Sequence, residues 1–189
     1  MPETLTTTSH ALLGLLALRP WTTYELTKQV RRSLEWFWPR AERKLYDEPK
    51  RLVAAGFATA REEYTGRRKR TVYEITPAGR DALAAWLREP SAPPSAENEA
   101  MVRVFFADGG DLDSLRATLA GMEEGARERL AALTAMSEGE PAFPERRHLS
   151  AITIRLQAEQ EQTTIRWAVS ARAEVAKWRA TDDPGVTYP

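Results

Sequence analysis

Four consecutive cations carry the most evident chemistry in this chain. They are Arg67, Arg68, Lys69 and Arg70, and they follow Gly66 between two short segments rich in Tyr, Thr, Val and Ile. Such segments around a glycine-containing tip predict a β-hairpin over residues 61–77. Because four like charges on a hairpin tip repel one another, they favour a neutralising partner, and a phosphate backbone is the commonest one. A solvated basic turn is the alternative interpretation.

The segments before this hairpin show three helical patterns in short succession. The first is an apolar run from Ala11 to Leu18, and the second begins after Thr22 and Thr23, which can cap its first turn. The third runs over residues 40–55 and is followed by Gly56, a residue typical of helix ends. Three helices followed by a basic hairpin is the order of a winged helix-turn-helix. In that fold the third helix enters the major groove of DNA and the hairpin, or wing, follows the backbone.

Residues 9–88 resemble the PadR-like transcriptional regulators in both residue types and spacing. The matching positions are Ala11-Leu12-Leu13-Gly14-Leu15-Leu16-Ala17-Leu18, Tyr24-Glu25-Leu26, Phe37-Trp38-Pro39, Tyr46, Lys50-Arg51-Leu52, Ala55-Gly56-Phe57, Val72-Tyr73 and Thr76-Pro77-Ala78-Gly79-Arg80. The second half is similar to the helical C-terminal domain of the longer members, which is described as virulence-activator-like. The resemblance implies a dimeric bacterial repressor in the cytoplasm, which binds a palindromic operator in double-stranded DNA and is released by a small-molecule effector or another signal.

Outward positions of the third helix are the candidates for reading DNA. Arg43 and Lys44 lie in its first turns, where base edges are reached, and the resemblance places Tyr46 against the DNA backbone. The expected DNA contacts combine this helix with the wing and with the tyrosine of the matched Tyr-Glu-Leu motif. They are Tyr24, Arg40, Arg43, Lys44, Tyr46, Asp47, Lys50, Arg51, Arg67, Arg68, Lys69 and Arg70.

Pro49 departs from the family pattern, which usually has Leu at this position. A proline inside a helix removes the amide that would bond to the carbonyl of Leu45, and its ring clashes with that carbonyl. It also biases Glu48 away from helical backbone angles. We therefore expect either a kink after Asp47 or a shorter reading segment over residues 40–47.

Charge and composition separate the two halves of the chain. Residues 1–88 hold 16 Lys and Arg against 10 Asp and Glu, whereas residues 89–189 hold 11 against 17. A basic half joined to an acidic half suits a DNA reader attached to a body that should not bind nucleic acid. The sequence contains no Cys, no apolar run of about 20 residues that would span a bilayer, and no phosphate loop or nucleophile elbow. We expect neither an enzyme with catalytic residues nor a bound metal or cofactor.

A proline-rich segment divides the sequence, since Pro90, Pro93 and Pro94 fall within seven residues. We expect a mainly α protein in four parts: a winged-helix domain of three helices and a two-stranded wing, a linker, an all-helical dimerisation domain and a tail. Their limits are residues 1–89, 90–96, 97–180 and 181–189. The last helical pattern covers roughly 35 residues, 144–179, and a helix of that length needs a partner along its side.

A second copy of the chain is the expected partner of that last helix. The expected interface residues are Leu149, Ile152, Leu156 and Ile165. The polar centre of the helix, residues 157–162, is either a solvated stretch or the lining of an effector cavity. In the second case the aromatic contacts would be Phe105, Phe106, Trp167 and Trp178. The alternative for the whole protein is a winged-helix protein-interaction module, whose basic wing binds an acidic partner instead of a specific DNA target.

Overall fold

Threonine side chains close the first turn of three helices in the N-terminal part of the chain. Helix α1 (Thr7–Leu18) begins after Thr6, α2 (Thr23–Ser33) after Thr22, and α4 (Pro77–Trp86) after Thr76. Each hydroxyl oxygen accepts a hydrogen bond from the amide three residues later, at 3.1 to 3.2 Å. Each bond satisfies a donor that the helix itself leaves free. The cap expected at Thr22 is confirmed.

The computed structural model describes residues 5–38, 42–66, 68–94 and 97–185, without the side chains of residues 42–44, 65 and 68. The chain divides into two compact units, residues 1–93 and 94–189. Each unit has buried apolar residues of its own. Among the described residues, no helix is both long enough and apolar enough to cross a membrane.

The N-terminal unit contains a three-stranded antiparallel sheet in the order β1-β3-β2, one strand more than the sequence predicts. The wing consists of β2 (Ala58–Thr65) and β3 (Arg68–Ile75), and the additional strand β1 (Trp21–Thr22) pairs with β3. Trp21 is buried, and its indole nitrogen donates a 2.7 Å hydrogen bond to the carbonyl of Leu15. A strand of two residues is too short to show a recognisable alternation of polar and apolar residues.

Leucines of α1 form the centre of the N-terminal unit, and the other elements pack around them. The nearly fully buried ones are Leu12, Leu13 and Leu16. Buried partners come from α2, from α3 (Glu42–Ala54) and from β3, and they include Leu26, Val30, Leu52, Val72, Tyr73 and Ile75. His10 of α1 stacks on Trp86 of α4, with ring centroids 4.7 Å apart and 6° between the ring planes. This core is the scaffold that holds α2, α3 and the wing in place.

Helix α3 runs without interruption from Glu42 to Ala54 and includes Pro49, so the expectation of a reading segment that stops at Asp47 is wrong. The side chain of Pro49 is fully buried. The neighbouring Glu48 carboxylate is also buried, and it accepts hydrogen bonds from the Ser9 hydroxyl of α1 and, at 2.9 Å, from Arg51. These contacts on both sides of Pro49 hold the backbone helical where the missing amide would otherwise favour a break.

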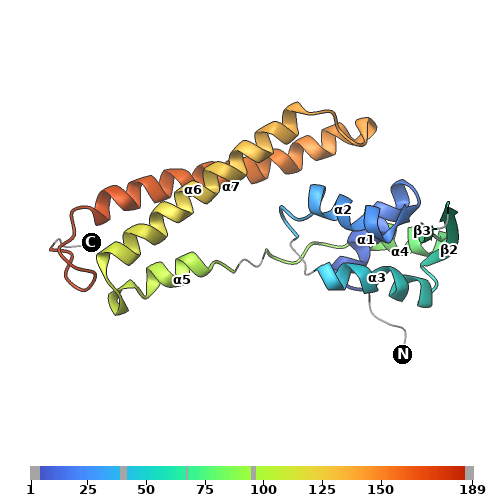
Figure 1. Cartoon of the computed structure of the whole chain (residues 1–189), viewed down its shortest axis with the longest axis horizontal. Coiled ribbons are helices and arrows are strands. Elements are labelled where there is room, and N and C mark those ends of the chain that lie inside the picture. The colour runs from blue at the N-terminus through green and yellow to red at the C-terminus, as the bar shows by residue number, and fades with distance from the viewer. Residues whose placement is uncertain (1–4, 39–41, 67, 95–96, 186–189) are drawn as a thin grey trace. The chain divides into compact units, whose positions relative to one another are not determined.

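Two long antiparallel helices, α6 and α7, make up most of the C-terminal unit (Figure 1). Helix α5 (Glu99–Phe105) and a 3-10 turn lead into α6 (Leu112–Glu138), and a second 3-10 turn (Pro144–Arg146) leads into α7 (Arg147–Val175). The helix expected over residues 144–179 is therefore shorter at both ends. Leu115, Leu119 and Val175 form a buried cluster where the two helices meet.

Ion pairs join α6 to α7 outside that cluster. Arg129 donates two hydrogen bonds to Glu161, at 2.8 and 2.9 Å, and Arg172 donates one to Glu123 at 2.6 Å. Hydrogen bonds from Arg127 and from Arg172 hold the pKa of Glu123 below its ordinary value. These pairs fix the register of the two helices, because each joins positions that lie side by side.

We expect Gly79→Ala to destabilise the protein although alanine favours helices. A Cβ atom at Gly79 would lie 2.1 Å from the carbonyl oxygen of Phe57 and 2.8 Å from Cγ1 of Ile75, so α4 would have to move away from the sheet. The expected cost in unfolding free energy is about 1 to 3 kcal/mol, measured by urea unfolding. Gly14→Ala is the matched control, because no atom lies within 4 Å of its Cβ position, and it should stabilise the protein by about 0.5 to 1 kcal/mol. Equal stability of the two variants would contradict this packing.

Candidate nucleic-acid interface

Helix α2 presents a polar stripe made of Tyr24, Lys28 and Arg31, which we call the α2 stripe. Their spacing of four and three residues places them on one face, and all three are exposed. The opposite face carries the buried Leu26 and Val30. Tyr24 is among the DNA contacts expected from the sequence, whereas Lys28 and Arg31 are not. The sequence signal for these two residues is their position around the helix axis, on the side opposite the apolar residues.

The start of α2 is rigidly held, which fixes the position of Tyr24. Burial would raise the pKa of Glu25, but hydrogen bonds from the amide and hydroxyl of Thr22 and the charge of Arg19 lower it below its ordinary value. The two Thr22 bonds are 2.8 and 2.7 Å long. Arg19 also lies over the ring of Trp21, 3.5 Å from its centroid. The helix begins with a closed network rather than a frayed turn.

Helix α3 buries Leu45 and Leu52 and leaves Tyr46, Asp47 and Lys50 exposed. Lys50 lies 3.3 Å from Asp47, and both side chains are more than half exposed, so this pair is open to competition from other charges. Arg51 is half-exposed and bonded to Glu48, which gives it a structural contact besides any contact with DNA. Arg40 lies outside the described residues, as do the side chains of Arg43 and Lys44.

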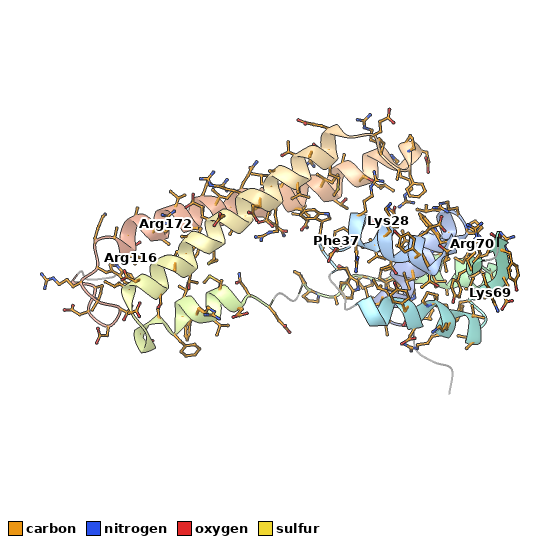
Figure 2. The ribbon with its side chains drawn as sticks, in the orientation of Figure 1. Lys28, Phe37, Lys69, Arg70, Arg116 and Arg172 are labelled. Atoms are coloured by element: carbon orange, nitrogen blue, oxygen red, sulfur yellow. The ribbon has the colours of Figure 1, made fainter. Side chains whose placement is uncertain are left out.

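Three of the four consecutive cations lie on a strand of the wing and not in its turn. Arg68, Lys69 and Arg70 belong to strand β3, and only Gly66 and Arg67 connect the two strands. The φ angle of Gly66 is +61°, the left-handed conformation that glycine adopts without strain. Lys69 and Arg70 project from the far end of the hairpin (Figure 2). Arg67 and the side chain of Arg68 lie outside the described part.

Two of the wing cations already have acidic partners within the hairpin. The Lys69 ammonium lies 2.6 Å from Glu62, and the Arg70 guanidinium lies 2.7 Å from Glu63. From the sequence, the expected neutralising partner of the four cations is a phosphate backbone outside the chain. The register of the hairpin supplies a partner internally, since Glu63 is directly opposite Arg70.

The expected dimer residues of α7 do not share one face. Leu149, Ile152 and Leu156 are 45%, 59% and 54% exposed, on the side of α7 that faces away from α6. Ile165 follows Leu156 by nine residues, which at about 100° per residue places it on the opposite side, where it is half-buried against α6. Trp167 follows Leu156 by eleven residues and returns to the first face. We call Leu149, Ile152, Leu156 and Trp167 the α7 stripe.

The four aromatic residues expected around an effector are in three different environments. Phe105 and Phe106 are 78% and 65% exposed and meet edge to face, with ring centroids 4.9 Å apart. Trp178 packs against the buried cluster of Leu115, Leu119 and Val175. Trp167 lies on the α7 stripe, eight residues before that helix ends, or roughly 12 Å along its axis. These positions do not form one aromatic cage in a single chain.

Exposed cations of α2, α3 and the wing include Lys28, Lys50, Lys69 and Arg70. They come from three elements of one unit, and that unit carries the positive excess of the chain. Among the described residues, no group of three or more His, Asp or Glu is placed to hold a metal ion. Contacts of this kind, with backbone phosphates and with base edges, account for recognition by a winged helix.

Two protein-family models match the chain, one for each unit. The model "Transcriptional regulator PadR-like family" matches residues 12–85, and the model "Virulence activator alpha C-term" matches residues 97–176. The protein is also similar to the "Negative transcriptional regulator PadR" of Bacillus subtilis. The two sequences are 28% identical over 181 residues, which cover 89% of this chain and 97% of that relative.

Solved structures of two relatives have the same fold. Bacillus subtilis PadR in complex with operator DNA matches 90% of this chain and 99% of that chain, with a TM-score of 0.77 and 22% identity. The same protein in complex with p-coumaric acid matches with a TM-score of 0.69. The Vibrio cholerae virulence activator AphA matches 90% of this chain and 98% of that chain, with a TM-score of 0.70 and 27% identity.

We expect Lys28→Ala to weaken binding to duplex DNA of any sequence. A phosphate contact contributes to affinity without reading bases, so the slope of log affinity against log salt should become shallower by about 0.9. Fluorescence anisotropy with a random-sequence duplex at several salt concentrations measures both quantities. Lys177→Ala is the control, since it removes one exposed lysine from the C-terminal unit and should leave the slope unchanged. If the two variants behave alike, the α2 stripe is not part of the interface.

Proposed function

We propose that this protein is a PadR-like transcriptional regulator that acts as a dimeric cytoplasmic repressor of a palindromic operator, because residues 12–85 match the PadR-like family model and residues 97–176 match the virulence-activator C-terminal model. It is not an enzyme. The observation that carries the proposal is that exposed cations of α2, α3 and the wing all lie in the unit that matches the family model. The name of the Bacillus subtilis relative, which this chain matches over nearly its whole length, supports repression rather than activation.

In this proposal some residues of the N-terminal unit contact base edges in the major groove of DNA, and others contact the phosphate backbone. Arg43 and Lys44, in the first turns of α3, reach base edges in the major groove. Asp47 joins Arg43 and Lys44 at the base edges. The other proposed residues contact phosphates: Tyr24, Arg40, Tyr46, Lys50, Arg51, Arg67, Arg68, Lys69 and Arg70. Residues 90–96 serve as the linker to the dimerisation domain.

The partner of the α7 stripe in this proposal is the α7 stripe of a second copy. Leu149, Ile152 and Leu156 form an apolar seam over two turns, with Trp167 about three turns further along, and a two-fold axis would bring two identical seams together. Met101, Val102, Phe105 and Phe106 of α5 add a further exposed apolar surface to the same unit. Closing these surfaces in a dimer would remove them from water, which is the largest favourable term in association.

A small-molecule effector is part of the proposal because Bacillus subtilis PadR was solved in complex with a small molecule, p-coumaric acid. In this chain the exposed Phe105 and Phe106, together with Trp167, retain free aromatic surface for such a ligand. Trp178 contributes from the cluster on which it packs. An effector seated beside the dimer seam would change the spacing of the two DNA-binding units, and that spacing determines whether both half-sites are reached.

A mobility shift with a palindromic fragment from the region upstream of the gene separates this function from the alternative. A repressor should bind the fragment at about 50 mM salt, lose much of its affinity by about 200 mM, and prefer the palindrome to a scrambled duplex of equal length. A protein-interaction module would bind neither duplex, even at the lower salt concentration. Binding both duplexes equally would reduce the proposal to a sequence-independent DNA-binding protein.

Arg43→Ala should weaken binding to the palindromic fragment more than binding to the scrambled duplex. Loss of a base contact typically costs about 1 to 3 kcal/mol on the correct site and much less elsewhere. Competition mobility shifts give the two affinities. Arg88→Ala, an exposed cation of the same unit outside the three proposed elements, should change neither affinity by more than about twofold. An equal loss on both duplexes would assign Arg43 to a phosphate instead of a base.

The variant Ile152→Glu, Leu156→Glu should be a monomer at micromolar concentration. It would bury two unpaired carboxylates in the seam, and each buried charge costs several kcal/mol. Sedimentation velocity measures the state directly. The control, Ala151→Glu, adds one carboxylate at the position before Ile152, on a face outside the α7 stripe, and this variant should remain a dimer. A wild-type monomer would contradict the dimer itself, whereas a dimeric double variant would contradict only the seam.

A further inference from the structure

Two carboxylates of the wing, on its opposite faces, pair with cations of the neighbouring strand. Successive residues of a strand point to opposite faces, so Glu62 and Glu63 of β2 are on opposite faces, as are Lys69 and Arg70 of β3. The register pairs Glu63 with Arg70 and Glu62 with Thr71. Lys69, two residues before Thr71, is therefore the diagonal neighbour of Glu62 on the same face. Each acid thus shares a face with a cation of the other strand.

The contacts on the two faces differ in number and exposure. On the first face, Glu63 is bonded to Arg70 through two nitrogens, at 2.7 and 3.2 Å, and lies 3.1 Å from Arg61. On the second face, Glu62 pairs with Lys69, at 2.6 Å, and with no other cation whose side chain the structure describes. The side chain of Glu63 is 27% exposed and that of Glu62 is 57% exposed. The first face keeps one excess positive charge among these residues, and the second face keeps none.

We propose that Glu62 and Glu63 are affinity-setting residues of the DNA interface, which compete with DNA phosphates for the cations of the wing. This inference depends on the proposed function, because it presupposes that the wing approaches a phosphate backbone. A cation that stays paired with an internal carboxylate neutralises no phosphate, so it releases no counterion and adds nothing to the salt dependence of binding. The carboxylate must turn away before Lys69 or Arg70 can bind DNA.

The pairs are strong enough to mask the cations and weak enough to open. Exposed ion pairs contribute little to stability, because water and salt screen them. A duplex phosphate can therefore replace the glutamate at a modest cost. The wing would then hold sequence-independent DNA weakly, and the affinity of the chain for any duplex would lie below the value that its basic run suggests.

Replacing each glutamate by glutamine, which has the same shape without the charge, tests the inference. Glu62→Gln and Glu63→Gln should each raise the affinity for a 30-base-pair random-sequence duplex about two- to fivefold at roughly 0.1 M salt. Each should steepen the salt slope by up to about 0.9. The matched control is Glu74→Gln, an exposed glutamate of β3 with no ion pair to a described residue, which should do neither.

A double-mutant cycle separates masking from a general effect of charge. Lys69→Ala should lower the affinity less than about twofold in the wild-type protein, where Glu62 already occupies the ammonium. In the Glu62→Gln background the same substitution should lower it about two- to fivefold. Equal effects of Lys69→Ala in both backgrounds, or equal effects of Glu62→Gln and Glu74→Gln, would overturn the inference. A wild-type protein that binds no duplex at about 50 mM salt would instead overturn the proposed function.

Discussion

The buried carboxylate of Glu48 is the contact on which the N-terminal unit depends. It lies in the middle of α3 and accepts a hydrogen bond from Ser9, and the same hydroxyl accepts a 2.9 Å bond from the amide of Thr6 at the cap of α1. A buried carboxylate without partners would cost several kcal/mol, so α3 gains its full stability only where α1 is correctly capped. The helix proposed to read DNA is thus positioned by the first turn of the chain's first helix.

Charge is arranged differently in the two units. In the C-terminal unit, cations and anions pair between α6 and α7, as with Arg129 and Glu161, and they hold the helices in register. In the N-terminal unit, pairs such as Lys50 with Asp47 lie at the surface of the elements that would contact DNA. Exposed pairs exchange partners easily, whereas pairs that join two helices also carry structure. Ion pairs therefore hold two helices together in the C-terminal unit, whereas in the N-terminal unit the exposed pairs could be exchanged for contacts with DNA.

Local signals in the sequence were enough to predict the helices, their threonine caps and the hairpin, because caps and periodicity involve residues within one or two turns. The burial of Glu48 could not be predicted in this way. Glutamate is usually exposed, and its partner Ser9 is 39 positions away. Strand β1 was missed because two residues carry no periodicity. Two geometric details follow from the sequence alone. The helical angle places Ile165 on the opposite side of α7 from Leu156, and a two-residue turn at Gly66 places Glu63 opposite Arg70.

The short strand β1 has a mechanical consequence. Its Thr22 pairs with Val72 of β3 and also caps α2, so the wing and the start of α2 belong to one rigid body. In the proposed complex, the distance between the phosphates contacted by the wing and those contacted by α2 would then be fixed by the protein. A duplex must match that distance through the width of its groove. Sequences that adopt this width at low elastic cost would be preferred at base pairs that no side chain reaches.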